Sequence, residues 1–211
     1  MSETTPRPYG TLLLFLFFCL LMAAIFYWML PGKAVPPELQ GVLRPEPVPL
    51  QAFELVDQYR QPFDLERLKG KWSLVFFGYT SCPDICPTTL SILNGVVKKM
   101  QADPQGPAGM QVVFVTVDPR RDTPDVIDNY LKYFNETFQG VTGAQQDIDS
   151  LARQFGAGYV NEPESAVGQY LVSHTSSIFL VDPRGRLLAA FSPPHDSNTI
   201  ADQFRQIRSL F

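Results

Sequence analysis

Cysteine and histidine are scarce in this chain of 211 residues, which has three Cys and two His. Three cysteines, Cys19, Cys82 and Cys86, are too few for a disulfide-stapled scaffold and cannot supply the four ligands of a structural zinc site. Positive charge is also limited, because 17 Lys and Arg face 21 Asp and Glu and no long basic run occurs. Nucleic-acid binding needs a basic face that displaces counterions, so we expect no nucleic-acid partner.

Charge is absent from residues 11–30, TLLLFLFFCLLMAAIFYWML. A helix of this length spans about 30 Å, the thickness of a bilayer core. We therefore predict a short tail at residues 1–10 and a single transmembrane anchor at 11–30. A cleaved signal peptide is the alternative, but the apolar stretch is longer than the roughly 7–15 residues of a signal-peptide core. Cys19 lies in the middle of this span, where it acts as a small apolar residue, and we assign it no function.

Six prolines are concentrated in residues 31–49. Proline lacks a backbone donor and favours extended, semi-rigid chain. We predict a stiff linker over residues 31–49, followed by one domain at residues 50–211.

Apolar runs and amphipathic segments alternate from about residue 50 onward. The runs at 72–79 and 110–117 predict buried strands, and the segments that follow them, 88–100 and 124–134, predict helices. Further expected elements are a leading hairpin at 53–63, a short strand or turn at 140–143, a helix at 147–155, a hairpin at 176–191 and a helix at 196–210. Parallel strands linked by helices and completed by an antiparallel hairpin predict an α/β domain of the thioredoxin-like class.

Cys82 and Cys86 fall in the predicted turn between the strand 72–79 and the helix that follows it. The amino end of a helix stabilises thiolate, the form that attacks disulfides and binds metal. An i, i+4 step places both thiols on one face, close enough for a disulfide or for one shared ion. Two thiolates make a soft site that suits Cu(I).

A plain stabilising disulfide between these cysteines is the simplest alternative. The loop it would close is very short, so its entropic contribution would be small. The pair also lies at the carboxyl end of a predicted parallel strand, where open α/β sheets place their binding sites. Both points favour a functional pair.

His174 directly precedes the first strand of the last predicted hairpin. In a thioredoxin-like domain this loop faces the thiols, so the imidazole could join both sulfurs around one ion. A Cys, Cys, His set suits Cu(I) and also Cu(II). The other histidine, His195, lies near the start of the last helix and is interpreted as a surface residue.

Three segments together resemble the Sco/SenC copper chaperones of cytochrome c oxidase assembly, over about residue 45 to the end. They are FFGYTSCPDICP at 76–87, VDPRRDTP at 117–124 and VSHT at 172–175. The resemblance implies that Cys82, Cys86 and His174 bind one copper ion. It also implies delivery of that copper to the binuclear copper centre of oxidase subunit II, outside the cytoplasm, and reduction of the cysteines of that subunit.

The resemblance has one departure, because relatives often carry an acid where this chain has Ser173. Further partners would be a copper donor chaperone and a thioredoxin-like reductant. Asp118 and Asp122, in the second segment, are interpreted as residues that satisfy turn and cap donors.

Two functions follow from these residues. The first is a metallochaperone, which transfers copper by ligand exchange and is not an enzyme in the strict sense. The alternative is a thiol–disulfide oxidoreductase that uses only Cys82 and Cys86, so His174 distinguishes the two. A peroxiredoxin-like peroxidase is disfavoured, because neither cysteine follows a Pro-x3-Thr-x2-Cys pattern.

The expected location is a bacterial inner membrane, with the domain facing the periplasm. No transit peptide rich in Arg and Ser precedes the apolar span, so the mitochondrial inner membrane is the less favoured alternative.

Overall fold

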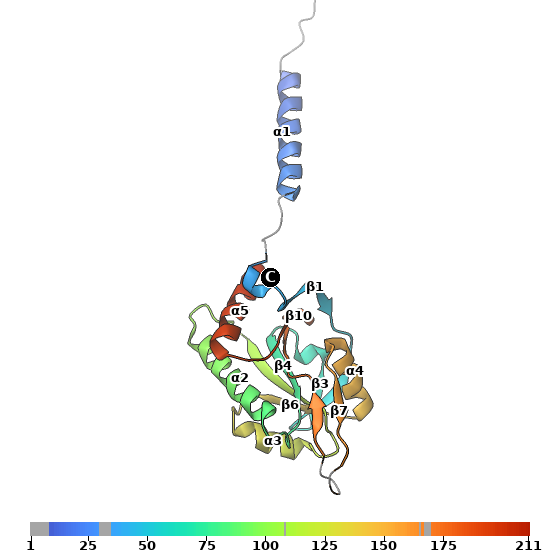
Figure 1. Cartoon of the computed structure of the whole chain (residues 1–211). Helices are drawn as coiled ribbons and strands as arrows, with labels where there is room; N and C mark the ends of the chain where they lie inside the picture. Colours follow the sequence, from blue (N-terminus) through green and yellow to red (C-terminus); the bar gives the residue numbers. More distant parts are fainter. Residues whose placement is uncertain (1–8, 30–34, 108, 165, 167–169) are drawn as a thin grey trace, which may run out of the picture. The chain divides into compact units, whose positions relative to one another are not determined.

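The computed structural model describes residues 9–29, 35–107, 109–164, 166 and 170–211, which form two compact units, Met1–Pro36 and Pro37–Phe211. The first unit contains helix α1 (Tyr9–Met29; Figure 1), and its described large apolar side chains are exposed. Within the described part of the chain, no helix meets the length and apolarity expected of a membrane-spanning helix. The anchor expected at residues 11–30, whose last residue lies outside the described ranges, stays a prediction.

The second unit is built on an eight-stranded mixed sheet with the order β1-β10-β9-β4-β5-β6-β2-β3. Its strands are β1 (Leu43–Pro49), β2 (Glu54–Asp57), β3 (Pro62–Asp64), β4 (Trp72–Gly78), β5 (Met110–Thr116), β6 (Gln139–Thr142), β9 (Ile178–Val181) and β10 (Arg186–Phe191). β4, β5 and β6 run parallel at the centre, and every other pairing is antiparallel. A separate two-stranded sheet consists of β7 (Tyr159–Asn161) and β8 (Val172–His174).

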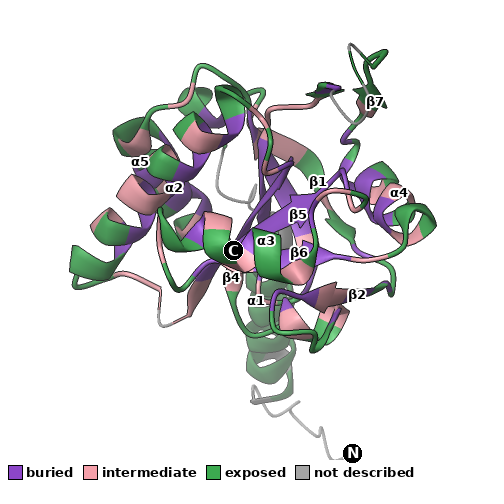
Figure 2. Ribbon diagram, turned by 90° about the horizontal axis from the view of Figure 1, so that it is seen from below, coloured by how far each residue is buried: buried purple, intermediate pink, exposed green. Residues whose placement is uncertain are grey.

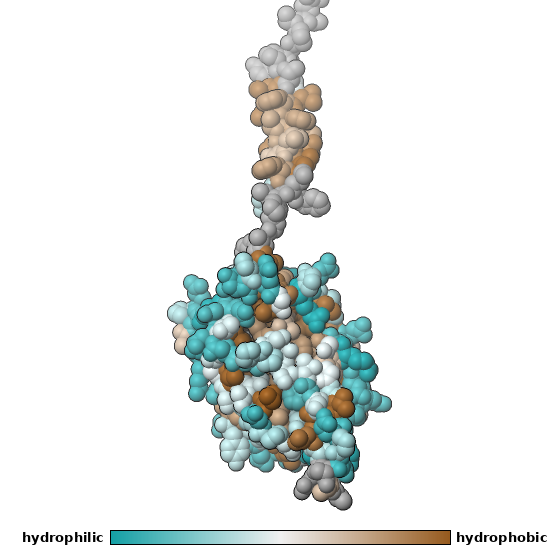
Figure 3. Space-filling model, in the orientation of Figure 1, coloured by the Kyte–Doolittle hydropathy of each residue, from teal (hydrophilic) through white to brown (hydrophobic). Residues whose placement is uncertain are grey.

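Helices cover both faces of the large sheet, so the central strands are buried (Figures 1 and 2). The helices are α2 (Ile85–Ala102), α3 (Pro124–Lys132), α4 (Gln145–Phe155) and α5 (Ser197–Leu210). Alternate residues of β4 point to opposite faces. The Trp72 ring packs edge-on against Phe204 of α5, whereas the Phe77 ring packs against Phe155 of α4. The face of this unit seen in Figure 3 is mainly hydrophilic, with scattered apolar patches.

Most elements expected from the sequence are present. The predicted helix at 88–100 begins earlier, at Ile85, so its first turn includes Cys86. The helix at 124–134 has the expected cap, since the Thr123 side chain accepts a hydrogen bond from the Val126 N–H and Pro124 follows the cap. The segment at 140–143 is a strand, β6, which begins at Gln139.

The predicted linker at residues 31–49 and the domain start at residue 50 need correction. Residues 30–34 lie outside the described ranges, but residues 37–49 belong to the second compact unit, with a buried Leu39 and the strand β1. Among the strands that the structure describes, β1 pairs with β10 alone, at the edge of the sheet. An edge strand tolerates proline because one side of its backbone needs no partner, which is why a proline-rich segment can be a strand here.

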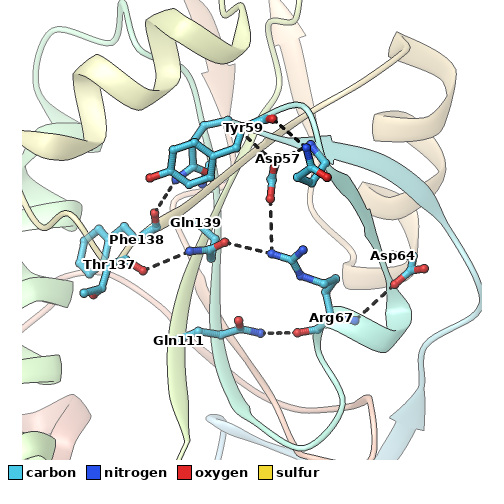
Figure 4. Close-up of polar contacts among 11 residues, drawn as sticks. Asp57, Tyr59, Asp64, Arg67, Gln111, Thr137, Phe138 and Gln139 are labelled. Carbon is cyan, nitrogen blue, oxygen red and sulfur yellow. Dashed lines mark hydrogen bonds and ion pairs between the residues drawn. The ribbon is translucent and has the colours of Figure 1, made fainter.

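A polar network fixes the amino ends of β5 and β6 (Figure 4). The Arg67 guanidinium donates to Asp57 Oδ2 at 3.3 Å and to Gln139 Oε1 at 3.4 Å. The Arg67 carbonyl accepts from the Gln111 side chain at 2.9 Å. The carboxyl ends of the parallel strands, at the opposite end of the sheet, are therefore the ends left for a binding site.

Candidate metal centre

The thiol pair lies where β4 passes into α2. β4 ends at Gly78, the Cys82 N–H donates to the Tyr79 carbonyl at 3.2 Å, and α2 begins at Ile85. Cys82 therefore precedes the helix and Cys86 lies in its first turn. The Cys86 N–H, one of the free donors of a helix amino end, points to Cys82 Sγ at 3.4 Å. This contact favours negative charge on the Cys82 sulfur.

Gly78 makes room for Cys86. A Cβ atom built on Gly78 would lie 2.9 Å from Cys86 Sγ and 2.9 Å from the Phe114 ring. Any side chain at this position would therefore displace the buried Cys86 sulfur. This role of Gly78 was not expected from the sequence, although a glycine at the end of an apolar strand is a known sign of close approach.

His174, the last residue of β8, points its imidazole at the thiols. Its Nε2 atom lies 3.4 Å from Cys86 Sγ, and its Nδ1 atom lies 3.1 Å from the Thr175 carbonyl oxygen. The ring is held edge-on by the Phe76 and Tyr79 rings, each with a centroid distance of 5.9 Å. The structure thus brings together all three residues expected from the sequence, with their ligand atoms within 4.8 Å of one another.

The hydrogen bonds of the histidine indicate its tautomer. A carbonyl oxygen only accepts, so Nδ1 carries the proton that faces Thr175. The Nε2 lone pair is then free and faces the Cys86 thiol. A neutral imidazole in this tautomer is a ready metal ligand.

The pKa values of the two cysteine thiols are shifted in opposite directions. The hydrogen bond from Cys86 lowers the pKa of Cys82 to about 3, against the opposing effect of burial. The same hydrogen bond, together with burial, raises the pKa of Cys86 well above its usual range. The metal-free pair therefore consists of a half-buried Cys82 thiolate and a buried Cys86 thiol at neutral pH. Metal binding to both sulfurs would release the Cys86 proton.

A cavity of about 650 Å³ opens beside the site. Apolar side chains border it on two sides, with Ile85 46% exposed and Leu171 54% exposed. The lining also includes Tyr79, Cys82, Pro83, Asp84, Glu162, Pro163, Val172, Ser173, His174 and Ser176. Both Cys82 and His174 are therefore accessible to a second molecule.

The remaining histidine and the third cysteine lie elsewhere. His195 is half-buried and its Nε2 bonds the Ser176 carbonyl at 2.8 Å, so the expected surface position is only partly correct. Cys19 lies in α1, in the other unit. Ser173 points away from the His174 ring, as alternation along a strand requires, and donates to Glu162 at 2.5 Å. The imidazole is oriented by the Thr175 carbonyl, whereas the side chain at position 173 faces Glu162.

The interpretation of Asp122 as a turn or cap residue is too narrow. Thr123 is the cap of α3, and the buried Asp122 carboxylate reaches in another direction. It accepts the Thr80 N–H at 3.0 Å, the Thr80 hydroxyl at 2.6 Å and the Thr116 hydroxyl at 2.5 Å. Asp122 thus anchors the turn that leads into Cys82.

Known proteins that are similar in sequence to this chain point to one family. The SCO1/SenC family model matches residues 44–209. A putative copper-binding protein of Stutzerimonas stutzeri is 40% identical over 153 residues, which cover 72% of this chain and 74% of the relative. The SCO2-like protein RP587 of Rickettsia prowazekii is 36% identical over 154 residues, or 72% of this chain and 74% of that protein. Curated relatives also include mitochondrial SCO2 proteins, such as that of Mus musculus, at 33% identity over 75% of this chain and 62% of the relative.

Solved structures give the same result. Yeast Sco1 with copper bound has a TM-score of 0.72 and 30% identity, with 78% of this chain and 91% of that chain covered. Arabidopsis thaliana ScoI with copper bound has a TM-score of 0.70 and 31% identity, with 75% and 98% covered. These likenesses confirm the thioredoxin-like α/β fold expected from the sequence, and the family match confirms the resemblance in the three segments. On its sequence match, its fold and the Cys, Cys, His group at the carboxyl end of β4, the chain belongs to the SCO1/SenC family.

Proposed function

We propose that this protein is a copper chaperone that binds one copper ion through Cys82, Cys86 and His174 and delivers it to the binuclear copper centre of cytochrome c oxidase subunit II. The observation that carries the proposal is the convergence of two sulfurs and one imidazole nitrogen within 4.8 Å. The two most distant of these atoms therefore lie at most about 2.4 Å from the point midway between them, close to the roughly 2.3 Å of a metal–thiolate bond. Soft sulfur ligands select Cu(I), and the imidazole also suits Cu(II).

The openness of the site supports transfer as well as binding. Copper passes between proteins by ligand exchange, so an incoming ligand must reach the ion while the first ligands still hold it. The half-buried Cys82 and His174 border the cavity, whereas Cys86 is buried beneath Gly78. We expect Cys82 and His174 to be exchanged first and Cys86 to release the ion last.

The test is metal analysis of the purified full chain in detergent after loading with Cu(I) or Cu(II). We expect one copper per chain in the native protein and loss of stoichiometric copper in Cys82→Ser, Cys86→Ser and His174→Ala. His195→Ala is the matched control, because His195 bonds Ser176 and not the thiol pair. Full copper loading of His174→Ala would refute the three-ligand site.

Delivery needs a separate test in cells. Deletion of the gene should lower oxidase activity and the copper content of subunit II at limiting copper, and the His174→Ala protein should not restore them. Unchanged oxidase assembly at limiting copper would refute the delivery role.

Membrane attachment belongs to the same proposal. Residues 11–30 carry no charged side chain, and the delivery role requires the domain outside the cytoplasm, in the periplasm of a bacterium. We expect the chain to remain with membranes after a carbonate wash and to be digested by protease added to spheroplasts. Release by carbonate, or protection from protease, would refute the anchored periplasmic topology.

A thiol–disulfide oxidoreductase is the second candidate, favoured by the opposite pKa shifts of the two cysteines. A thiolate at Cys82 with a buried thiol at Cys86 is a suitable attacking and resolving pair for a disulfide in a partner. Reduction of an oxidised subunit II fragment should persist in His174→Ala if this function is separate from copper binding. Loss of that activity in His174→Ala would contradict a reductase that uses the thiols alone.

A further inference from the structure

The large sheet holds only the carboxyl side of the segment that carries His174, where Ile178 of β9, four residues further on, pairs with Phe76 of β4. β8, which ends at His174, pairs only with β7 among the described strands, whereas the turn carrying Cys82 follows β4 of the large sheet. Main-chain pairing therefore fixes the end of β4 but leaves the amino end of β8 without a ladder to the central strands. On that amino side, the separation of the two ligand-bearing segments depends on side-chain contacts.

The loop of residues 117–123, between β5 and α3, contacts the segment that carries His174. The Arg121 guanidinium donates to the Tyr170 carbonyl at 2.9 Å and stacks on the Tyr170 ring, 3.8 Å from its centroid. The Tyr170 hydroxyl donates to Asp118 Oδ1 at 2.7 Å, and Arg121 Nε forms an ion pair with Asp118 Oδ2. Tyr170, four residues before His174, is thus held at its carbonyl, its ring and its hydroxyl.

The same loop contacts the segment that carries the thiols, because Asp122 accepts two hydrogen bonds from Thr80, two residues before Cys82. The two contacts are rigidly connected. The Arg121 and Asp122 N–H groups both donate to the Asp118 carbonyl, at 3.2 and 3.0 Å. The loop of residues 117–123 therefore contacts both the segment that carries the thiols and the segment that carries His174.

These side chains do more than a turn requires. The turn is closed by the Asp118 carbonyl, and the helix is capped by Thr123, so neither needs the Arg121 guanidinium. A largely buried ion pair is weak evidence for stability, because desolvation offsets the attraction, but it can specify one geometry over others. The side chains in this pair, Arg121 and Asp118, are 23% and 2% exposed.

We propose that Asp118, Arg121 and Asp122 are positioning residues that set the distance between the His174 imidazole and the two thiols. The expected effect on copper binding rests on the proposed function. The expected position of the His174 imidazole concerns the metal-free protein and can be measured there. Loosening the loop on the Tyr170 side should let the imidazole move away from Cys86 while the thiol pair stays in place. The copper site would then lose its nitrogen ligand in part of the population.

The test compares Arg121→Gln and Tyr170→Phe with a matched control, Arg186→Gln. Tyr170→Phe removes only the hydroxyl that binds Asp118, and so guards against a variant that fails to fold. Arg186 pairs with Asp182, and their side chains are 23% and 3% exposed, nearly the same as in the first pair. Asp182 follows β9 at the end that pairs with Ser73, the end of β4 opposite the thiols.

Three measurements are made on the full chain in detergent. The first is the midpoint of thermal unfolding without metal, and the second is the copper affinity together with the Cu(II)–thiolate absorption and EPR spectra. The third is the set of nuclear Overhauser effects between the His174 ring and the rings of Phe76 and Tyr79. We expect Arg121→Gln and Tyr170→Phe to weaken copper binding by about tenfold or more, as loss of an outer contact often does. Their Cu(II) spectra should change and the ring contacts of His174 should weaken. Arg186→Gln should lower the midpoint to a similar degree with native copper affinity and spectra.

Native affinity and spectra in Arg121→Gln, or an equal loss in Arg186→Gln, would overturn the proposal. If the native chain bound no copper, the proposed function would fail by itself. The ring contacts of His174 without metal would still decide the positioning role: their loss in Arg121→Gln but not in Arg186→Gln supports it, and their retention overturns it.

Discussion

His174 Nε2 lies 3.4 Å from Cys86 Sγ, although 88 residues separate the two along the chain. Three features meet at this contact: the glycine that leaves room for the Cys86 sulfur, the aromatic rings that flank the imidazole, and the carbonyl that holds the Nδ1 proton. The glycine controls the position of the sulfur, and the rings and the carbonyl control the orientation of the imidazole.

The thiols should differ sharply in reactivity with pH. Because the pKa of Cys82 is lowered to about 3, its thiolate persists well below neutral pH, while the raised pKa of Cys86 keeps that thiol protonated. Iodoacetamide should therefore alkylate Cys82 at a nearly constant rate from pH 8 to pH 5, roughly two units above its pKa, and leave Cys86 unmodified. Mass spectrometry of the peptides separates both sites from Cys19.

Cys86→Ala is the control for this profile, because the Cys86 hydrogen bond is the largest cause of the lowered pKa. The Cys82 pKa should rise in this variant, so alkylation should slow as the pH falls. A native rate that drops about tenfold per unit below pH 8 would contradict the assignment of Cys82 as a stable thiolate.

Gly78→Ala should weaken both copper binding and the fold. The added methyl group would lie 2.9 Å from both Cys86 Sγ and the Phe114 ring, so the sulfur must move. We expect a loss of about 1–3 kcal/mol in the free energy of unfolding, typical of overpacking, and a loss of copper affinity of at least roughly tenfold. Urea unfolding and a copper titration measure the two effects.

Gly109→Ala is the matched control. Its added methyl would make only ordinary contacts, the nearest at 3.4 Å, just before the amino end of β5. If Gly78→Ala bound copper as tightly as this control, the close approach of Gly78 to Cys86 would have no role in the site.

Phe76 and Phe77 offer a matched pair on opposite faces of β4. Both rings are buried, but Phe76 packs against His174 and Phe77 packs against Phe155. Substitution of either by Leu should cost about 1–2 kcal/mol of stability from lost packing. Only Phe76→Leu should also weaken copper binding, because the imidazole loses one of its flanking rings. Equal copper affinity of the two variants would contradict a role for Phe76 in holding His174.

The boundary of the folded unit can be tested by truncation. A chain of residues 37–211 should unfold at the urea concentration of the full chain, because the first unit ends at Pro36. A chain of residues 50–211 lacks the buried Leu39 and the strand β1. We expect it to lose several kcal/mol, since burial of Leu39 alone contributes about 2 kcal/mol. Equal stability of the two truncated chains would show that residues 37–49 act only as a linker.

The sequence alone determined the features that depend on local pattern. The apolar run at β4 and the periodic apolar residues of α2 predict a buried strand followed by a helix, because side-chain burial imposes periods of 2 and 3.6 residues. The junction between strand and helix must then carry Cys82 and Cys86, whatever the rest of the fold. The three segments near the site also carried the family resemblance, because their residues and spacing are specific.

Only the tertiary structure decided what depends on partners distant in sequence. The prolines of β1 indicate a linker by composition, and only the pairing with β10 makes the segment an edge strand. The sequence around Gly78 does not show that this residue faces Cys86. The sequence around Arg121 does not show that its guanidinium binds Tyr170. Local pattern records which face of an element is apolar, but the distance from His174 to the thiols is set by long-range packing, which has no periodic signature in the sequence.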